Sequence, residues 1–444
     1  MNSLATLHGR ALRGAIGALQ RSARQRFLLA AFVVGLLPLP SAVHGAAATR
    51  THEVAARACR ALAARVDAVA DGAPVLLRSY DGASGSGEPD EPALRTAAFV
   101  YDNALAVVAL LACDRRAQAL RIAEALRVAA TTDARLRNVY RAGRVGDRAL
   151  ANGWWDARQN RWVEDAYQQG SATGNVAWAG LALLAAFDAT RDERWRDAAA
   201  RLAHWVAEHA LGENGRGFSG GIDGFDAQPV KVTWKSTEHN IDLVALFGRL
   251  ARARVHDGLP ARAAAEQDWS THAQNARRFV DSQWDAASGH FFVGTLPDGK
   301  TPNRLNSGLD VQLWSQLLPD APPEWRRAIA YAEREHAVPG GFDFNTDRDG
   351  LWLEGTAQAV LVYRTIGRET DADRLLATIA QQFSAGGLVN ATREPRITTG
   401  LAIGSASVSA DFYYFRLPHL GATAWAALAA TGRNPFAPPA SAAP

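Results

Sequence analysis

The chain has 444 residues, of which 48% are hydrophobic and 21% charged, and its formal net charge is +3. These proportions are typical of globular proteins and exclude a chain that is disordered as a whole. Its two cysteines are too few for a disulfide-dense scaffold or a cysteine-based metal site.

The N-terminal segment has the pattern of a secretory signal peptide. Residues 1–26 contain five arginines and no acidic residue, and an apolar run follows over residues 27–37. Small residues at 41–48 then offer a cleavage site. This order predicts a signal peptide over residues 1–48, cleaved near 45–48. The apolar run is too short for a stable membrane span, so we expect a periplasmic or secreted protein.

Loss of this leader changes the charge balance and the surroundings of the cysteines. Its removal leaves 43 basic groups against 45 acidic ones. The basic pI therefore belongs largely to the leader, and we expect no nucleic-acid partner. In an oxidising compartment Cys59 and Cys113 could form a disulfide, because the helices predicted below place both at the same end of neighbouring antiparallel helices. Two unpaired buried thiols are the alternative.

Six segments share one pattern, a small or polar residue followed by a helix rich in Ala, Leu and Trp. They are apolar almost all round, which predicts buried, inner helices. In an alignment of the six, residues of the N-cap type share one position. The segments are 101–111, 173–184, 238–247, 308–318, 354–363 and 421–429, and the aligned residues are Asn103, Asn175, Asn240, Asp310, Thr356 and Thr423.

Between these segments lie helices of a second kind, which combine charged residues with an apolar stripe and are expected to be outer. Short turns follow the inner helices, which predicts antiparallel neighbours. Long connections rich in Gly, Asp and aromatic residues precede them, with alternation that indicates short hairpins. The predicted outer helices are 54–69, 115–129, 193–210, 261–283, 325–336 and 371–383.

This alternation predicts an all-α fold, an (α/α)6 toroid with six inner and six outer helices and short β-hairpins in the long loops of one face. A single catalytic domain would span residues 49–436, followed by a flexible tail at 437–444. An open α-solenoid is the alternative. Closure is favoured because the first outer helix needs the last inner helix as its neighbour.

In a toroid, the first turns of all inner helices meet at one central cleft, where helix dipoles favour carboxylates. The densest cluster of polar residues is Thr-Trp-Lys-Ser-Thr-Glu-His-Asn-Ile-Asp at 233–242. Two carboxyl groups that flank a polar cleft are what glycosidic cleavage requires. We predict Glu238 and Glu354 as this pair, with Asp102 and Asp242 as alternates. Helix capping is the alternative reading of each.

Substrate contacts are predicted on the same face. Lys235 and His239 would tune or orient Glu238, and exposed tryptophans would stack on sugar rings. Asp242, Gln312 and Gln358 share a repeat position that favours a wet cavity, although hydrogen bonds in the core would also satisfy them. The predicted substrate-binding residues are Trp154, Trp155, Asn175, Trp234, Lys235, His239, Gln312, Trp352 and Gln358.

One loop partly resembles a calcium-binding loop. Reading from Asn345, the residues Asp347, Asp349 and Gly350 fit the pattern, but its last position holds Thr356 instead of Glu. A polar turn is the favoured interpretation. We expect neither a metal nor a cofactor.

With Trp-Trp-Asp at 154–156, Trp-Lys-Ser-Thr-Glu-His-Asn at 234–240 and Glu-Gly-Thr-Ala-Gln at 354–358, residues 52–436 resemble the six-hairpin glycosidase-like superfamily. The resemblance implies acid/base carboxylates at the inner-helix N-termini and activity on glycosidic bonds. The same toroid also hosts sugar epimerases and polysaccharide lyases, so fold does not determine reaction. We expect an exported, monomeric glycoside hydrolase with a carbohydrate substrate. The alternatives are a lyase or epimerase that uses His239 or a tyrosine as base, and a non-catalytic glycan-binding protein.

Overall fold

A computed structural model describes residues 42–212, 216–256, 269–404, 407, 409–410 and 412–439. The predicted signal peptide lies outside these residues, except that residues 42–48 form the start of the first helix. Most of the predicted tail, 440–444, also lies outside them. Among the described residues, no helix is both long and apolar enough to cross a membrane.

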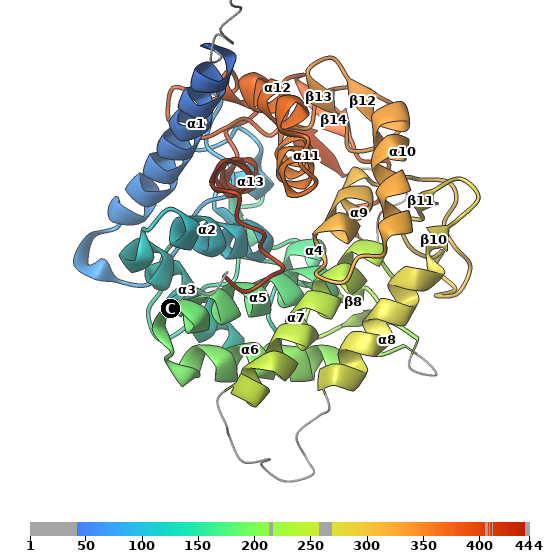
Figure 1. The fold of residues 1–444 in the computed structure, drawn as a ribbon. Helices are drawn as coiled ribbons and strands as arrows, with labels where there is room; N and C mark the ends of the chain where they lie inside the picture. Colours follow the sequence, from blue (N-terminus) through green and yellow to red (C-terminus); the bar gives the residue numbers. More distant parts are fainter. Residues whose placement is uncertain are drawn as a thin grey trace, which may run out of the picture. The chain divides into compact units, whose positions relative to one another are not determined.

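Six helices form a closed inner ring within the compact unit Val43–Pro444. Each contacts the next one in chain order, and the last contacts the first, which confirms the toroid and excludes an open solenoid (Figure 1). The inner helices are α2 (Val100–Ala112), α5 (Thr173–Thr190), α7 (Thr237–His256), α9 (Leu309–Trp314), α11 (Leu353–Thr365) and α13 (Leu420–Thr431).

The outer helices are amphipathic, as expected, and turn their apolar stripes toward the inner ring. In α6, for example, Trp195, Leu202 and Val206 are buried while charged residues occupy the other face. The side chain of Arg121 on α3 donates to Val66 O of α1. The outer helices are α1 (Ala42–Asp67), α3 (Arg116–Thr132), α6 (Glu193–His209), α8 (Trp269–Ser282), α10 (Arg327–Glu335) and α12 (Glu369–Ala380).

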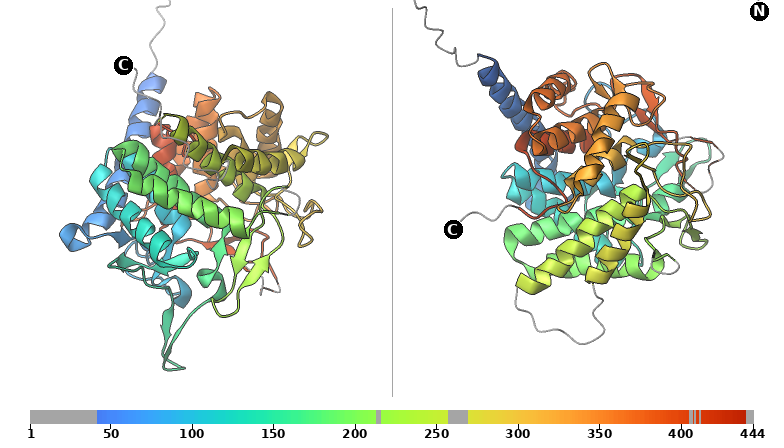
Figure 2. Two further views of the ribbon diagram at one scale, coloured as in Figure 1. Left: turned by 90° about the horizontal axis from the view of Figure 1, so that it is seen from below. Right: turned by 45° about the vertical axis from the view of Figure 1, so that its right-hand side comes forward.

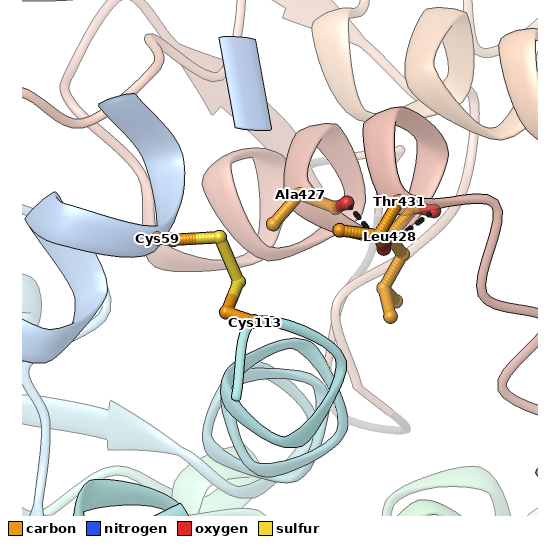
Figure 3. Close-up of a disulfide and its surroundings, with 5 residues drawn as sticks. All are labelled: Cys59, Cys113, Ala427, Leu428 and Thr431. Carbon is orange, nitrogen blue, oxygen red and sulfur yellow. Dashed lines mark hydrogen bonds between the residues drawn. A yellow bond between two sulfur atoms is a disulfide. The ribbon is translucent and has the colours of Figure 1, made fainter. Parts of the chain in front are cut away.

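Of the two alternatives left open for Cys59 and Cys113, the structure has the disulfide. It joins α1 to the residue that follows α2, with the two Cα atoms 5.8 Å apart. Figure 3 shows it beside the last turns of α13, where Ala427, Leu428 and Thr431 lie. The bond therefore fixes the first outer helix at the point where the ring closes.

Short antiparallel strands occupy the long connections before the inner helices, as predicted. They are two or three residues long and shape one face of the ring. The short helix α4 (Ala166–Gln169) lies in the same region. The pairs are β1 (Val75–Leu76) with β4 (Gly143–Arg144), β2 (Ala97–Phe99) with β3 (Val139–Arg141), β5 (Trp154–Asp156) with β6 (Arg161–Val163), β7 (Ser171–Ala172) with β8 (Gly221–Asp223) and β8 with β9 (Val230–Val232), β10 (Trp284–Asp285) with β11 (His290–Phe291), β12 (Ala337–Val338) with β13 (Gly341–Phe342), and β14 (Arg396–Thr398) with β15 (Tyr413–Phe415).

A polar side chain at the fourth residue of five inner helices ties each helix to a preceding extended segment. Asn240, for example, accepts from Phe218 N–H at 2.9 Å and donates to Phe218 O at 3.0 Å. Gln312 makes the same pair of bonds with Phe291. The other members are Asn103 with Leu77, Thr356 with Phe342 and Thr423 with Val389.

These contacts correct two expectations. The predicted N-cap residues Asn103, Asn240, Thr356 and Thr423 do not cap their own helices, because their oxygens accept from another segment. The predicted alignment is also two residues off in α9, where Gln312, and not Asp310, is the equivalent of Asn240. Gln312 is therefore a buried scaffold residue, and its predicted place in a wet cavity is wrong.

Candidate active site

The second residues of the inner helices surround a central cavity of about 180 Å³, which we call the catalytic cavity. Glu238, Asp310 and Glu354 occupy this position on three consecutive inner helices, and Tyr101 occupies it on α2. At the same position of α13, a Cβ on Gly421 would lie 2.5 Å from Asp102 Oδ1 and 2.9 Å from Glu354 Oε2. The glycine thus leaves room for two carboxylates.

Glu238 and Asp310 form a carboxyl pair. Glu238 is partly exposed to the cavity, whereas Asp310 is only 5% exposed. Burial, followed by the Asp310 charge, raises the pKa of Glu238 well above its usual range. Burial also raises the pKa of Asp310, but Val311 N–H and the hydrogen bond with Glu238 oppose this and hold it at about 6. Glu238 therefore carries the proton and donates a hydrogen bond to the Asp310 carboxylate.

Glu354 has a different set of partners. The Trp425 indole donates to Tyr101 Oη at 2.9 Å, and Tyr101 donates in turn to Glu354 Oε1 at 2.5 Å. Burial raises the pKa of Glu354 to about 7, although His419 and the Tyr101 hydroxyl act in the opposite direction. Its second oxygen, Oε2, has no hydrogen-bond partner among the described residues. Glu354 is therefore built to accept a hydrogen bond or a proton.

His419 and Asp102 complete the polar side of the catalytic cavity. His419 directly precedes α13, and its Nε2 lies 3.2 Å from Asp102 Oδ2. Burial lowers the pKa of His419, but the Asp102 carboxylate and Glu354 outweigh it, so that the net shift is upward. Nδ1 accepts from Ala422 N–H, so that in the neutral ring the proton lies on Nε2, toward Asp102. Tyr80 stacks on this ring with 4.3 Å between the centroids.

The sixth residues of the inner helices close the cavity from below. Trp178, Trp314 and Trp425 contact one another with centroid separations of 5.4 to 6.1 Å. Asp242 and Gln358 occupy the same position on α7 and α11, are fully buried, and do not line the cavity. Asp242, predicted as an alternate catalytic residue, and Gln358, predicted to bind substrate, therefore lie beneath the cavity wall. Burial, followed by the charges of Glu238 and Asp310, raises the pKa of Asp242 well above its usual range.

A second cavity of about 370 Å³, the outer cavity, adjoins the catalytic cavity and shares Glu238, His239 and Asp310 with it. Trp234, 37% exposed, stands in its wall and has its ring 5.8 Å from that of His239. Burial lowers the pKa of His239 to about 4, so this ring is neutral near pH 7. The two cavities together form a cleft that narrows toward the three carboxyl groups.

Aromatic side chains make up much of the cavity wall. The predicted Trp352 is among them, although it is 1% exposed and packs against Phe344 and Tyr414. Asn175 lines the same wall and donates to Asn138. The remaining aromatic lining residues are Tyr80, Phe99, Tyr101, Tyr167, Trp178, Trp314 and Phe412.

Three predicted binding residues lie away from the catalytic cavity. Trp154 and Trp155 belong to the β5–β6 hairpin, which projects from the rest of the compact unit (Figure 2, left, teal), and line neither the catalytic nor the outer cavity. Lys235 points to another cavity, donates to Arg216 O and lies over the Phe279 ring. Burial, followed by the charges of Asp310 and Glu354, raises the pKa of Glu238, whereas Lys235 was predicted to tune that group.

The loop compared with a calcium site has a compact acidic cluster. Carboxylate oxygens of Asp343, Asp347 and Asp349 lie within 4.8 Å of one another. Backbone N–H groups, including those of Phe344 and Thr398, donate to them. The Thr398 N–H belongs to strand β14, so this cluster is tied to a distant strand as well as to its own loop.

Sequence reasoning gave His419, Tyr101 and Tyr80 no role and placed Asp310 among the caps. Because Asp310 follows Gly308 at the start of a short helix, it resembled a capping residue. His419 had a signal that was available, since it directly precedes the sixth inner helix as Trp352 precedes the fifth.

A comparison with protein-family models and with curated proteins finds no match. Among solved structures, a wild-type glycosidase aligns with a TM-score of 0.57 and 15% identity over 88% of this chain and 99% of that chain. A cellobiose 2-epimerase from Spirochaeta thermophila aligns at 0.58 and 13% identity over 89% and 99%. A D-mannose isomerase aligns at 0.55 and 10% identity over 86% and 96%. The chain therefore has the (α/α)6 toroid fold that these sugar-processing enzymes share.

Proposed function

We propose that this protein is a glycoside hydrolase in which Glu238 is the general acid and Glu354 the general base. The observation that carries the proposal is the opposite environment of two carboxyl groups in one cleft. Glu238 donates to a neighbouring carboxylate, whereas Glu354 accepts from Tyr101. One group is thus prepared to give a proton and the other to take one, which is the division of labour that glycosidic cleavage requires.

The hydrogen bond between Glu238 and Asp310 excludes these two as the flanking pair. Carboxyl groups that act on opposite sides of a glycosidic bond stand roughly 5 Å apart or more. Hydrogen-bonded carboxyl groups are much closer than that. Asp310 is therefore a positioning residue that keeps Glu238 protonated, and Glu354 supplies the second carboxyl group.

In the proposed reaction, Glu238 transfers its proton to the glycosidic oxygen as the bond from the anomeric carbon to that oxygen breaks. A water oxygen attacks the anomeric carbon, and the water proton passes to Glu354. The charges balance, because one carboxylic acid becomes a carboxylate and one carboxylate becomes an acid. This assignment makes the reaction inverting, with water as the nucleophile.

The closed end of the cleft supports action on a chain end. The tryptophan layer beneath the cavity leaves no exit on that side, and the catalytic cavity is smaller than the outer cavity. A terminal sugar would fill the catalytic cavity and the next unit would meet Trp234. Structures with this fold include a glycosidase variant in complex with glucose.

The test is a screen of the purified protein on α- and β-linked oligosaccharides, with products identified by NMR. We expect release of terminal sugars with inverted anomeric configuration. Glu238→Gln and Glu354→Gln should each lower kcat about 10²-fold or more, while the control Asp197→Asn, at an exposed residue that lines none of the cavities, should leave it unchanged. Full activity in both active-site variants would refute the assignment.

An epimerase is the second candidate, supported by the positions of His239 and His419. They belong to the third and the sixth inner helix of the ring, which stand opposite each other, and both line the catalytic cavity. One imidazole could remove the proton from C2 of a reducing sugar while the other returns a proton to the opposite face. Deuterium incorporation at C2 from heavy water, without release of new reducing ends, would favour this reaction over hydrolysis.

We also propose that the protein is exported. The N-terminal pattern of the sequence and the Cys59–Cys113 disulfide both support this location, because disulfides persist in oxidising compartments. Cell fractionation and N-terminal sequencing of the mature protein would test it.

A further inference from the structure

All three lysines of this chain line one cavity, which we call the basic groove. The sequence contains 45 arginines and only Lys231, Lys235 and Lys300. The groove has a volume of about 900 Å³ and is also lined by Arg216 and Arg278. Lysines that are this rare along the chain and yet share one cavity indicate a common role. A lysine is a compact, hydrated charge on a flexible stem and can follow an anion that moves.

The acidic residues of the groove offset only part of this positive charge, because Asp281 and Asp298 stand against three lysines and two arginines. Asp281 forms an ion pair with Arg277 at 2.8 Å, outside the set of groove residues. Asp298 accepts from Lys300 N–H, Thr301 N–H and the Thr301 hydroxyl. Among the described residues, neither Lys231 nor Lys300 has an acidic side chain in ion-pair contact. The groove therefore has an excess of positive charge facing solvent.

The basic groove is continuous with the proposed catalytic cleft. Val232 and Lys235 line both the groove and the outer cavity, and Glu238 lines both the outer and the catalytic cavity. Strand β9 carries Lys231 and Val232 and leads within a few residues to Glu238 on α7. A sugar chain with its end in the catalytic cavity would reach Trp234 and then the lysines.

We propose that the basic groove binds the anionic groups of a charged glycan, carboxylates or sulfates, on sugar units beyond the cleaved bond. The identification of the ligand as a glycan rests on the proposed function, whereas the anion preference rests on the lysines. The substrate class is then an acidic oligo- or polysaccharide. The groove would raise the affinity of the protein for such chains. Added salt would weaken this binding, because the charges of the groove are exposed.

The experiment measures binding by calorimetry in the full-length Glu354→Gln protein, so that probes remain intact. The probes are three decasaccharides, namely an oligogalacturonate, a sulfated dextran and a neutral dextran. We expect at least one anionic probe to bind about tenfold more tightly than the neutral one at low ionic strength, with the difference shrinking in 0.5 M salt. Comparison of the oligogalacturonate with the sulfated dextran shows whether the groove prefers carboxylates or sulfates.

Substitutions then assign the effect to the groove. Lys231→Gln with Lys300→Gln should weaken binding of the anionic probe about tenfold, and Lys231→Arg with Lys300→Arg should largely restore it. Arg326→Gln, at an exposed arginine that lines none of the three cavities, is the matched control and should have no effect. Equal affinity for charged and neutral probes, or unchanged binding in the double glutamine variant, would overturn the proposal. So would tighter binding of a single-stranded oligonucleotide than of either anionic glycan.

The two proposals can fail separately. If the lysine-dependent binding is found but no oligosaccharide is hydrolysed by the wild-type protein, the proposed function fails and the anion site stands. If hydrolysis is found but charge has no influence on binding or on KM, the anion site fails and the hydrolase stands.

Discussion

Glu238 and Asp310 occupy the same position on consecutive inner helices, and Glu238 donates a hydrogen bond to the Asp310 carboxylate. Closure of the ring brings these two residues together although they lie on different helices, α7 and α9. This contact distinguishes Glu238 from Glu354, whose partners are a tyrosine hydroxyl and a histidine. It also yields the first prediction.

Asp310→Asn should move the alkaline limb of the pH–rate profile to lower pH. The Asp310 charge and hydrogen bond raise the pKa of Glu238, so their removal lets the general acid lose its proton more easily. The measurement is kcat/KM against pH for the wild type and the variant. An alkaline limb that stays in place would show that Glu238 is not the acid. Asp197→Asn, on the surface and outside the cavities, serves as the control.

Tyr101→Phe should move the acidic limb of the same profile to higher pH. The Tyr101 hydroxyl favours the ionised form of Glu354, whose pKa is about 7. Without it, that pKa rises and the base is protonated at pH values where it was active. We expect a larger loss of kcat/KM at pH 6 than at pH 8. An equal loss of kcat/KM at both pH values would show that Tyr101 contributes only through packing and does not affect the pKa of Glu354.

Asp242→Asn should make the protein more stable, and more so at pH 8 than at pH 5. The pKa of Asp242 is above its unfolded value of about 3.9, so the folded protein keeps a proton that the unfolded chain releases. Each pH unit between the two values lowers the free energy of unfolding by about 1.4 kcal/mol. Asparagine has no proton to lose, and this slope should disappear. Thermal melts at the two pH values test it, and parallel curves for both proteins would contradict it.

Cys59→Ser with Cys113→Ser should lower the free energy of unfolding by up to about 4 kcal/mol. The bond closes a loop across a sequence separation of 54 residues, and loop entropy predicts an effect of this size. Urea unfolding of the variant and of the oxidised wild type provides the comparison. Reduction of the wild type should reproduce the effect of the double substitution. A change below about 1 kcal/mol would show that α1 is held by packing alone.

The helical repeat itself was readable from the sequence. Segments such as 421–429 are apolar on all sides, and a helix of that kind has to be buried. The amphipathic helices between them can only lie outside, and the position of the two cysteines made their pairing one of two open alternatives. Each of these inferences depends on local composition and on the count of helices. Composition and helix count can be read from the chain without knowing how the inner helices align with one another.

Only the tertiary structure determined which polar residues of the first turns face the cavity. Asp310 and Gln312 lie two residues apart, and two residues turn a helix by about 200°. An alignment error of two residues therefore confuses a residue that lines the cavity with one that is buried in the scaffold. The bond between His419 and Asp102 joins residues 317 positions apart and exists only because α13 closes against α2. Likewise, Lys300 joins the other two lysines because Thr233, which follows β9, donates to Pro297 O in the loop before Lys300. The sequence thus determined which helices form, whereas closure of the ring determined which of their side chains meet.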